Sequence, residues 1–243
     1  MTLTVKEKFT EWACSLSGCD GGNPKADIWL SGIEWGYDSR ESSIDTYYKE
    51  LLPQEILKGE YTPKTNYIWK DHLNYTFGRN VAKLFTAINA GNVEDYRTLE
   101  NRNEQELFRL NLYPIAFNST DDDLWRSNRL NEWTGFEEKA LYKTWCFMHR
   151  FPAIAKKVRE YNPKCIICTG TSYLTDFFVC FAGYGSKTSE IKVENISGTR
   201  KLYSAKLNDK TVLVVIPFFS GAYGLNSNEL LQKTGGIISR LIP

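Results

Sequence analysis

The chain has 243 residues and a mass of 28.0 kDa, which is enough for one large domain or two small ones. Its composition, 42% hydrophobic and 24% charged, is that of a globular protein, and no stretch of about 18 uninterrupted apolar residues is present that could cross a membrane. The formal net charge of +1 excludes a global positive field that would hold a polyanion.

The N-terminal segment MTLTVKEKFTEW contains acidic residues and no apolar stretch, so it predicts neither a secretory signal nor a transit peptide. We therefore expect a cytosolic protein. From the length of the chain we expect a single domain over residues 1–243. In the cytosol cysteines are expected to be reduced thiols. The chain has six of them: Cys14, Cys19, Cys146, Cys165, Cys168 and Cys180.

The first half of the chain predicts two strands, 26–34 and 108–117, because both runs are apolar and rich in β-branched or aromatic residues. Between them lies an irregular insertion at about 37–76, dense in Tyr and polar groups, with a short helix around TYYKELL. Residues 77–89 have the apolar periodicity of a helix.

The second half predicts a helix over 136–161, broken near Pro152, then a strand at 164–170 and a helix at 171–182. A hairpin turning at Ser197-Gly198 (190–207) leads into a strand at 211–219. A final helix begins after Ser227 as N-cap and is weakened by Gly235-Gly236. Strands that alternate with helices predict a three-layer α/β/α fold around a mainly parallel four-stranded sheet.

The residues that follow the four strands indicate where a ligand would bind, because ligands of parallel α/β sheets lie at the carboxyl ends of the strands. A carboxylate, an amide, glycines and aromatic rings converge there, which suits recognition of a planar polar ring. The segments concerned are Gly32–Gly36, Asn111 to Pro114, Thr169-Gly170 and Pro217–Gly221.

The first of these segments lies in GNPKADIWLSGIEWG, which resembles the first-strand signature of uracil-DNA glycosylases, especially the thermophilic iron-sulfur type. FGRNVAKLF, NLYP, YNPKCIICTG and VVIPFFS follow in the order of that family's motifs, and together these segments span most of the chain. Each motif is short, so their order carries the resemblance. The resemblance implies the uracil-DNA glycosylase fold.

The resemblance also implies roles for individual residues. Glu34 falls where the family positions the attacking water, a task that suits a carboxylate. Phe77 falls where an aromatic ring stacks on the flipped base, and Asn111 where an amide reads the pyrimidine edge. The base would also contact the first loop, at Gly32, Ile33, Trp35 and Gly36.

Structural explanations compete with each of these roles. A glutamate at a strand end can cap a turn or pair with a local arginine, an aromatic ring can be plain core, and a strand-end amide can bond the backbone.

The segment after the last strand falls where the family inserts a side chain into the DNA duplex. The residues concerned are Pro217, Phe219, Ser220, Tyr223 and Leu225, of which Leu225, Tyr223 or Phe219 could be the wedge. The alternative is a glycine-rich turn buried under the insertion.

Several residues depart from the family's pattern. Ile216 stands where many relatives have a histidine, which should weaken stabilisation of the leaving base. Trp35 and Tyr37 are bulkier than the residues usual in the first loop and could narrow the pocket. His72 and His149 form no recognisable catalytic or metal-binding motif.

The cysteines also depart from the iron-sulfur relatives, which need four thiolates. Cys14, Cys19 and Cys146 form an incomplete set, because the fourth position, close to Ala116, has no cysteine. Cys165 and Cys168 lie in a predicted strand, where residues three apart point to opposite faces, so this pair is a poor metal clamp. We therefore expect neither an iron-sulfur cluster nor another metal.

The sequence thus predicts a monofunctional DNA base-excision glycosylase that acts on uracil or a related damaged base by water-mediated hydrolysis of the N-glycosidic bond. DNA would be held by a local basic patch, for which residues 150–210, with eleven Lys and Arg against five Asp and Glu, are the candidates, although such charges usually face solvent. The alternatives are a non-catalytic DNA- or nucleotide-binding module that keeps the fold, and a hydrolase of free nucleosides or nucleotides.

Overall fold

The structure is a computed structural model, which describes residues 5–34, 36, 44–61, 63, 66–104, 106–117, 123–185 and 190–243. Trp35 and Tyr37, two bulky residues of the predicted first loop, lie outside the described residues. Among the described helices, none is long and apolar enough to cross a lipid bilayer.

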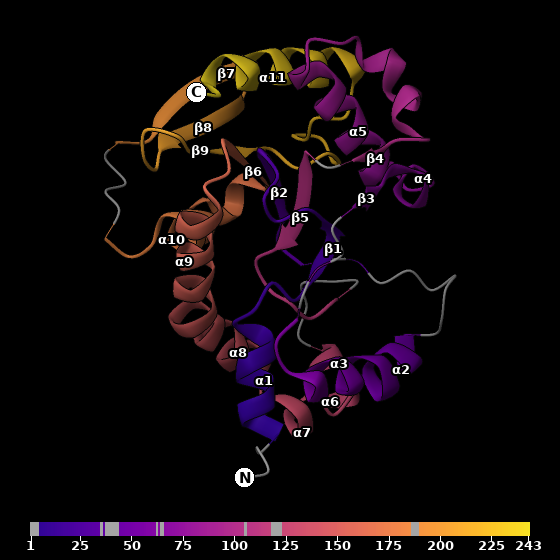
Figure 1. Cartoon of the computed structure of the whole chain (residues 1–243), viewed down its shortest axis with the longest axis vertical. Helices are drawn as coiled ribbons and strands as arrows, with labels where there is room; N and C mark the ends of the chain where they lie inside the picture. Colours follow the sequence, from indigo (N-terminus) through magenta and orange to yellow (C-terminus); the bar gives the residue numbers. More distant parts are fainter. Residues whose placement is uncertain are drawn as a thin grey trace.

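The centre of the molecule is a seven-stranded mixed sheet in the order β1-β5-β2-β6-β9-β8-β7 (Figure 1). Its four central strands β5, β2, β6 and β9 are parallel to one another, and their register joins Ile28 to Leu107 and to Cys165. The strands are β1 Cys19–Gly22, β2 Ile28–Gly32, β5 Leu107–Asn111, β6 Cys165–Thr169, β7 Lys192–Ser197, β8 Arg200–Lys206 and β9 Val212–Ile216.

The prediction of a four-stranded sheet is therefore correct for the parallel core and wrong for the whole sheet. The β7–β8 hairpin pairs antiparallel with β9 and extends one edge. On the other edge β1 pairs antiparallel with β5. Its sequence, Cys-Asp-Gly-Gly, has no apolar alternation. Gly22 has φ +102°, and a Cβ there would lie 2.2 Å from the Leu107 carbonyl oxygen, so only glycine fits.

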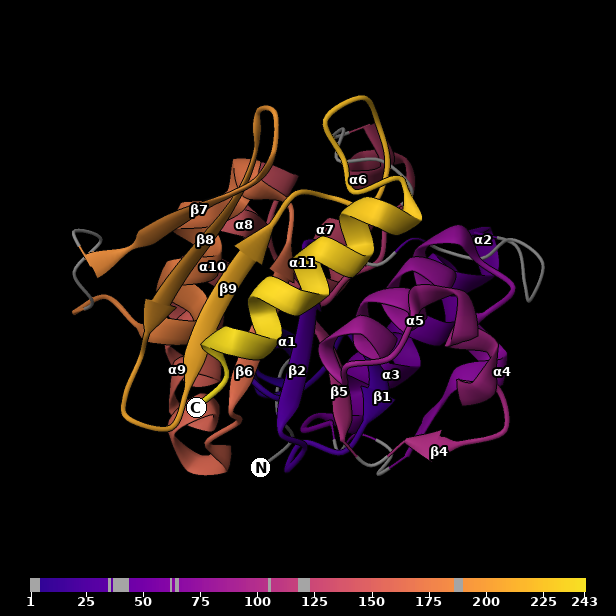
Figure 2. The ribbon, with the colours of Figure 1, turned by 90° about the horizontal axis from the view of Figure 1, so that it is seen from above.

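Two helical layers cover the sheet (Figures 1 and 2). The upper layer consists of η2 Val93–Leu99, α5 Thr76–Ile88 and α11 Asn228–Leu241. The lower layer contains α1 Val5–Ala13, α8 Lys139–Trp145, η3 Cys146–Arg150, α9 Phe151–Tyr161 and α10 Leu174–Ala182. Side chains alternate along β2 as the pleat requires: Ile28 and Leu30 pack in the upper core and Trp29 in the lower core. The three-layer arrangement matches the prediction.

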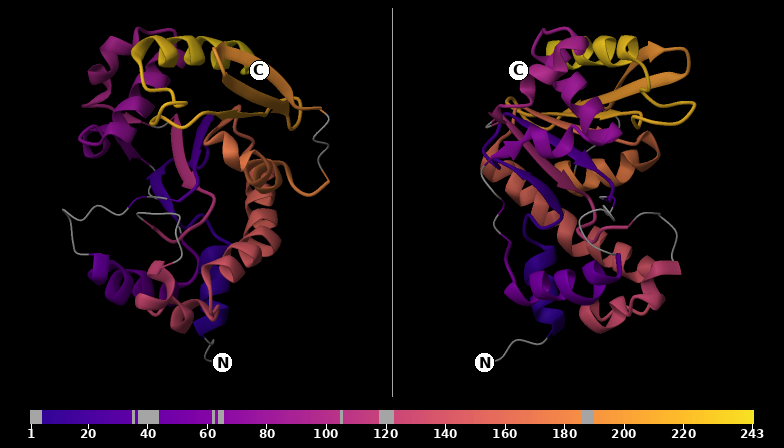
Figure 3. Two further views of the ribbon diagram at one scale, coloured as in Figure 1. Left: turned by 180° about the vertical axis from the view of Figure 1, so that it is seen from behind. Right: turned by 90° about the vertical axis from the view of Figure 1, so that its right-hand side faces the viewer.

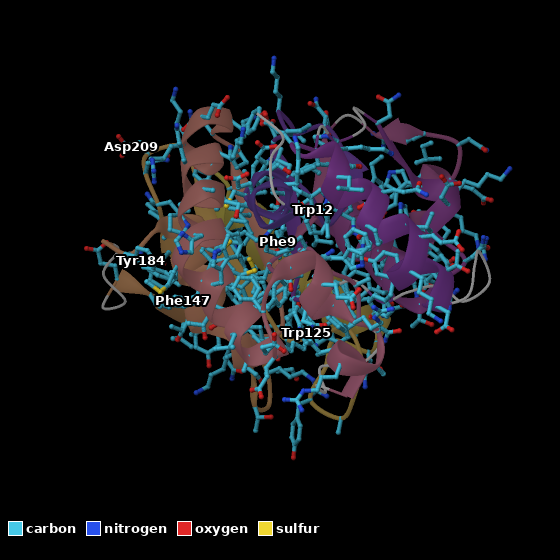
Figure 4. The ribbon with its side chains drawn as sticks, turned by 90° about the horizontal axis from the view of Figure 1, so that it is seen from below. Phe9, Trp12, Trp125, Phe147, Tyr184 and Asp209 are labelled. Carbon is cyan, nitrogen blue, oxygen red and sulfur yellow. The ribbon has the colours of Figure 1, made fainter. Side chains whose placement is uncertain are left out.

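The lower core is rich in aromatic side chains. Figure 4 shows three of them, Phe9, Trp12 and Trp125, from below. Phe9 and Trp12 of α1 and Trp125 are each 1% exposed. Phe147 and Tyr184 lie at the margin, with ring centroids 5.8 Å apart.

The described part of the predicted insertion is more ordered than an irregular loop. It forms α2 Ile44–Thr46, a π-helical turn η1 Tyr47–Leu51 and α3 Leu52–Lys58, which lie with α1 at the end of the molecule away from α11 (Figure 3). Tyr47, Tyr48 and Ile56 are buried in the lower core. The remaining short elements are β3 Tyr67–Ile68, α4 Trp69–His72, β4 Asn103–Glu104, α6 Asp123–Ser127, α7 Leu130–Thr134 and η4 Thr171–Tyr173.

The predicted break near Pro152 is a local π-helical turn rather than an end of the helix. The backbone stays right-handed helical at Trp145, Cys146, Arg150 and Phe151. Pro152 is the second residue of α9 and directly follows this π-helical turn, a local widening of the kind that accommodates a proline inside a helix. The chain therefore runs helically from Lys139 to Tyr161.

Candidate functional site

Glu34 lies at the topological switch point of the parallel sheet. The chain runs from β2 through α5 to β5 on one side, and from β5 through α8 and α9 to β6 on the opposite side of β2. In open α/β sheets the crevice beside such a point is the usual ligand site. Glu34 follows β2 by two residues and Gly170 follows β6 directly. Gly170 has φ +121°, and a Cβ there would lie 3.2 Å from Ile33 Cδ1, so the two strand ends meet closely.

The carboxylate of Glu34 points to α8, where two lysines contact it. Lys139 Nζ lies 3.2 Å from Oε2 and Lys143 Nζ lies 3.7 Å from Oε1. The side chain of Glu34 is 4% exposed, that of Lys139 0% and that of Lys143 26%. Lys139 Nζ also lies 3.7 Å from the centroid of the Phe117 ring. Among the described residues, Oε1 of Glu34 accepts no hydrogen bond.

Two opposing effects set the pKa of Glu34. Burial raises it, because the charged form loses hydration, while the ammonium groups of Lys139 and Lys143 lower it. Burial is the larger effect, so the pKa lies above the usual value. A raised carboxyl pKa in a strand-end crevice is typical of a general base.

Three tyrosines surround this carboxylate. Tyr48 donates to the Ala116 carbonyl at 2.6 Å, and Tyr113 donates to Oδ2 of Asp176 in α10 at 3.1 Å. Burial is the main cause that raises the pKa of Tyr48, Tyr113 and Tyr142, and the charge of Glu34 adds to it. All three hydroxyls are therefore neutral hydrogen-bonding groups.

The sequence predicts a role for Glu34 but not for Lys139, Lys143 or Tyr113. The lysines are four residues apart, which places them on one face of α8. That spacing was the available signal, but nothing in the local sequence shows that Lys139 would be buried.

Phe77 and Asn111, the predicted base-binding residues, have their described contacts elsewhere. Phe77 lies in the first turn of α5 in the upper layer, and its ring centroid lies 5.1 Å from that of Phe219. Asn111 is 5% exposed, and its Nδ2 donates to the Gly18 carbonyl at 3.1 Å. A Cβ at Gly32 would lie 2.6 Å from Asn111 Oδ1. The structure thus brings Asn111 to Gly32 and Phe77 to Phe219, whereas Glu34 contacts α8 below the sheet; Gly36 is exposed.

A second charged cluster lies beside Phe77 and was not anticipated. Arg109 of β5 pairs with Asp20 at 2.6 Å, donates to the Tyr67 hydroxyl at 2.7 Å, and places Cζ 5.1 Å from the Phe77 ring centroid. His72 stacks on Tyr67 with centroids 4.4 Å apart. Burial, with the charge of Arg109 next, lowers the pKa of His72 to about 4, so this imidazole is neutral at physiological pH.

The loop after β9 is compact and mostly turned inward. Phe219 is 2% exposed and Leu225 0%, and both belong to the upper core, as does Ile216. Tyr223 is 77% exposed. Of the three candidate wedge residues, Tyr223 is therefore the one whose side chain reaches solvent. Pro217 is buried and Ser220 exposed.

Hydrogen bonds hold this loop in place. Arg200 donates from Nε to the Gly224 carbonyl at 2.9 Å, and the Leu225 amide donates to the Phe218 carbonyl at 2.8 Å. The strand predicted over 211–219 is therefore too long: β9 ends at Ile216, and a pre-organised loop follows it.

The cysteines of the incomplete set lie around a buried arginine. Burial raises the pKa of all three, to about 11 for Cys19 and about 12 for Cys146, and the charge of Arg150 offsets only part of this rise. Burial thus keeps these three thiols protonated.

The second pair of cysteines, Cys165 and Cys168, lies on opposite sides of the sheet. Cys165 belongs to the upper core and Cys168 to the lower core, which confirms the opposite orientations predicted for this pair. Among the described residues no group of three or more His, Cys, Asp or Glu side chains could hold a metal ion.

A hollow of about 440 Å³ opens elsewhere, at the start of α11, and shares no residue with the Glu34 site. Gln232 spans it by accepting from the Val93 amide at 2.9 Å and donating to the Gly91 carbonyl at 3.0 Å. Its lining is Ala90, Gly91, Asn92, Val93, Asn228, Glu229 and Gln232.

The fold and the site together define an α/β domain with a mixed sheet and a buried carboxylate at its switch point. No protein-family model matches the chain, and no curated protein is similar to it in sequence.

Proposed function

We propose that the protein is a DNA base-excision glycosylase, which hydrolyses the N-glycosidic bond of uracil or a related damaged base. The observation that carries the proposal is Glu34, a buried carboxylate at the switch point of the sheet whose Oε1 accepts no hydrogen bond from the described residues. A carboxylate oxygen in this state is suited to receive a proton from an attacking water.

In the proposed reaction water attacks C1′ of the deoxyribose, and the bond from C1′ to the base nitrogen breaks. The base leaves with the bonding electrons, and Oε1 of Glu34 takes the proton of the water. Lys139, 3.2 Å from Oε2, fixes the orientation of the carboxylate. The ring of Phe77 is the proposed stacking surface, and exposed Tyr223 with the basic hairpin β7–β8 would contact DNA.

The test is release of free base from oligonucleotides that contain uracil in single strands, in U·A pairs and in U·G pairs. We expect release, and Glu34→Gln should lower its rate by about 100-fold or more. Glu55→Gln is a matched control, because Glu55 of α3 is another carboxyl whose pKa burial raises but which lies away from the switch point. Absence of release on all three substrates by folded protein would refute the proposal.

A second function is favoured by the contacts of two predicted site residues. The Nδ2 donor of Asn111 already bonds the Gly18 carbonyl, and both oxygens of Glu34 face ammonium groups. These contacts suit a non-catalytic module that binds DNA or a nucleotide. Such a module would bind the oligonucleotides without releasing base, and Glu34→Gln would leave its affinity nearly unchanged.

A further inference from the structure

Lys143 differs from Lys139 although both contact Glu34. The side chain of Lys139 is fully buried, and its ammonium lies on the Phe117 ring. The side chain of Lys143 is 26% exposed, and its Nζ stands 3.7 Å from Oε1, beyond hydrogen-bond distance. Its other described contact is the face of Tyr113, with Nζ 5.3 Å from the ring centroid. Lys143 is thus a primary amine that solvent reaches, beside a carboxylate oxygen able to accept its proton.

We propose that Lys143 is a nucleophilic amine that forms an imine with the aldehyde of a base-free deoxyribose, which gives the site a strand-cleaving activity in addition to base removal. The inference rests on the proposed function, because base removal is the reaction that produces this aldehyde. Lysine amines are the side chains that form Schiff bases with carbonyl substrates.

The steps balance without a cofactor. The ammonium of Lys143 passes one proton to Oε1 of Glu34, and the neutral amine attacks C1′ of the ring-opened sugar. Loss of water, which carries away the carbonyl oxygen, forms the C=N bond. Oε1 of Glu34 returns its proton to the imine nitrogen, and the carboxylate so formed takes a proton from C2′. The electrons of that C–H bond form the new C=C bond, and the bond from C3′ to its phosphate oxygen breaks with its electrons leaving on the phosphate. Hydrolysis of the imine returns the free lysine.

The arrangement of the site assigns this role to Lys143 rather than Lys139. A nucleophile must reach its carbonyl carbon, and a side chain with no exposed surface cannot do so. Lys139 remains the group that orients Oε2. The raised pKa of Glu34 supports the proton transfer, because burial makes its carboxylate a stronger proton acceptor.

A lysine of equal exposure provides the matched control. Lys157 of α9 is also 26% exposed and also faces a carboxylate, that of Glu60 at 3.9 Å, but it lies away from the carboxyl ends of the strands. A difference between Lys143 and Lys157 therefore reports position in the site and not general reactivity of exposed lysines.

The experiment uses the full chain, an oligonucleotide with a preformed abasic site, and borohydride, which reduces an imine to a stable amine. We expect a covalent protein–DNA adduct whose attachment maps by mass spectrometry to Lys143. Lys143→Gln and Lys143→Arg should each reduce the adduct by at least about tenfold per bound oligonucleotide, and Lys157→Gln should not reduce it. The arginine variant keeps the positive charge next to Glu34, so it separates nucleophilicity from charge.

The outcomes distinguish this inference from the proposed function. An adduct that survives both Lys143 substitutions, or maps to another lysine, overturns the inference. Release of uracil without any adduct also overturns it and leaves the glycosylase proposal standing. An adduct at Lys143 without uracil release supports the inference and refutes the glycosylase proposal.

Discussion

Glu34, Lys139 and Lys143 show how burial and charge act together on a single residue. A carboxylate that leaves water loses hydration, and nearby ammonium groups replace only part of it. The side chain of Glu34 is 4% exposed and still keeps a raised pKa beside two lysines. The folded chain therefore holds the neutral form of Glu34 more readily than the unfolded chain does.

This balance predicts a pH dependence of stability. Because the folded-state pKa of Glu34 is above its usual 4.5, ionisation of this group opposes folding. The stability that the neutral form of Glu34 contributes is fully present below pH 4.5, and it is lost as the pH rises through the raised pKa. Glutamine does not ionise, so Glu34→Gln does not undergo this pH-dependent loss of stability. As the pH rises from 4.5 through the raised pKa, the unfolding free energy of the variant should therefore rise relative to that of the wild type. Urea unfolding at a series of pH values measures the difference, and parallel curves would contradict the expectation.

At the scale of elements, the contact between α5 and α11 depends on one glycine. The predicted weak point at Gly235-Gly236 is a continuous helix in the structure, capped by Ser227, which accepts from the Leu230 amide at 3.2 Å. Gly235 is buried against α5: a Cβ there would lie 2.4 Å from Ala87 Cβ, whereas at Gly236 it would meet nothing within 4 Å. The two adjacent glycines thus have different roles.

Alanine at these two positions should have opposite effects. Gly235→Ala forces the helices apart, and we expect it to destabilise the protein by about 2 kcal/mol, since overpacking outweighs the gain in helix propensity. Gly236→Ala should stabilise it by about 0.5–1 kcal/mol, because only the propensity changes. Thermal or urea unfolding of both variants provides the measurement, and equal effects would refute this account of the packing.

The predicted elements were correct where a local pattern sufficed and too long where it did not. The apolar run at 108–117 predicts one strand, but β5 ends at Asn111 and residues 112–117 pack as a buried loop. In the same way β9 ends at Ile216, and Pro217 begins the compact loop. An apolar run indicates that residues are buried, but both strands and packed loops are buried. The run therefore does not show where the strand ends.

At the scale of the whole molecule, Arg150 joins segments that are distant in sequence. It has no exposed surface, and its guanidinium donates to the main-chain carbonyls of Ala13, Ser15, Ser17, Asn111 and Leu112 and to the Ser17 hydroxyl. These bonds connect the segment after α1, the end of β5 and the π-helical turn η3. One charged side chain thus connects three elements that are distant in sequence.

Removal of Arg150 should therefore destabilise the whole fold. We expect Arg150→Met to lower the unfolding free energy by about 3 kcal/mol, because it leaves buried carbonyl oxygens without donors. Arg126→Met is the control: the side chain of Arg126 is 77% exposed in its ion pair with Glu138, so its loss should cost less than about 0.5 kcal/mol. Denaturant unfolding compares the two variants, and a small effect at Arg150 would show that water satisfies these carbonyls.

The sequence by itself determined the features that depend on neighbouring residues: the parallel strands, the helix after Phe77, the β7–β8 hairpin, the Ser227 cap and Glu34 at a strand end. Only the tertiary structure decided the edge strand β1, the burial of Lys139, the central place of Arg150 and the inward orientation of Leu225. The physical reason is that periodicity and capping act within a few residues. Burial and the pairing of buried charges depend on residues that meet from distant parts of the chain.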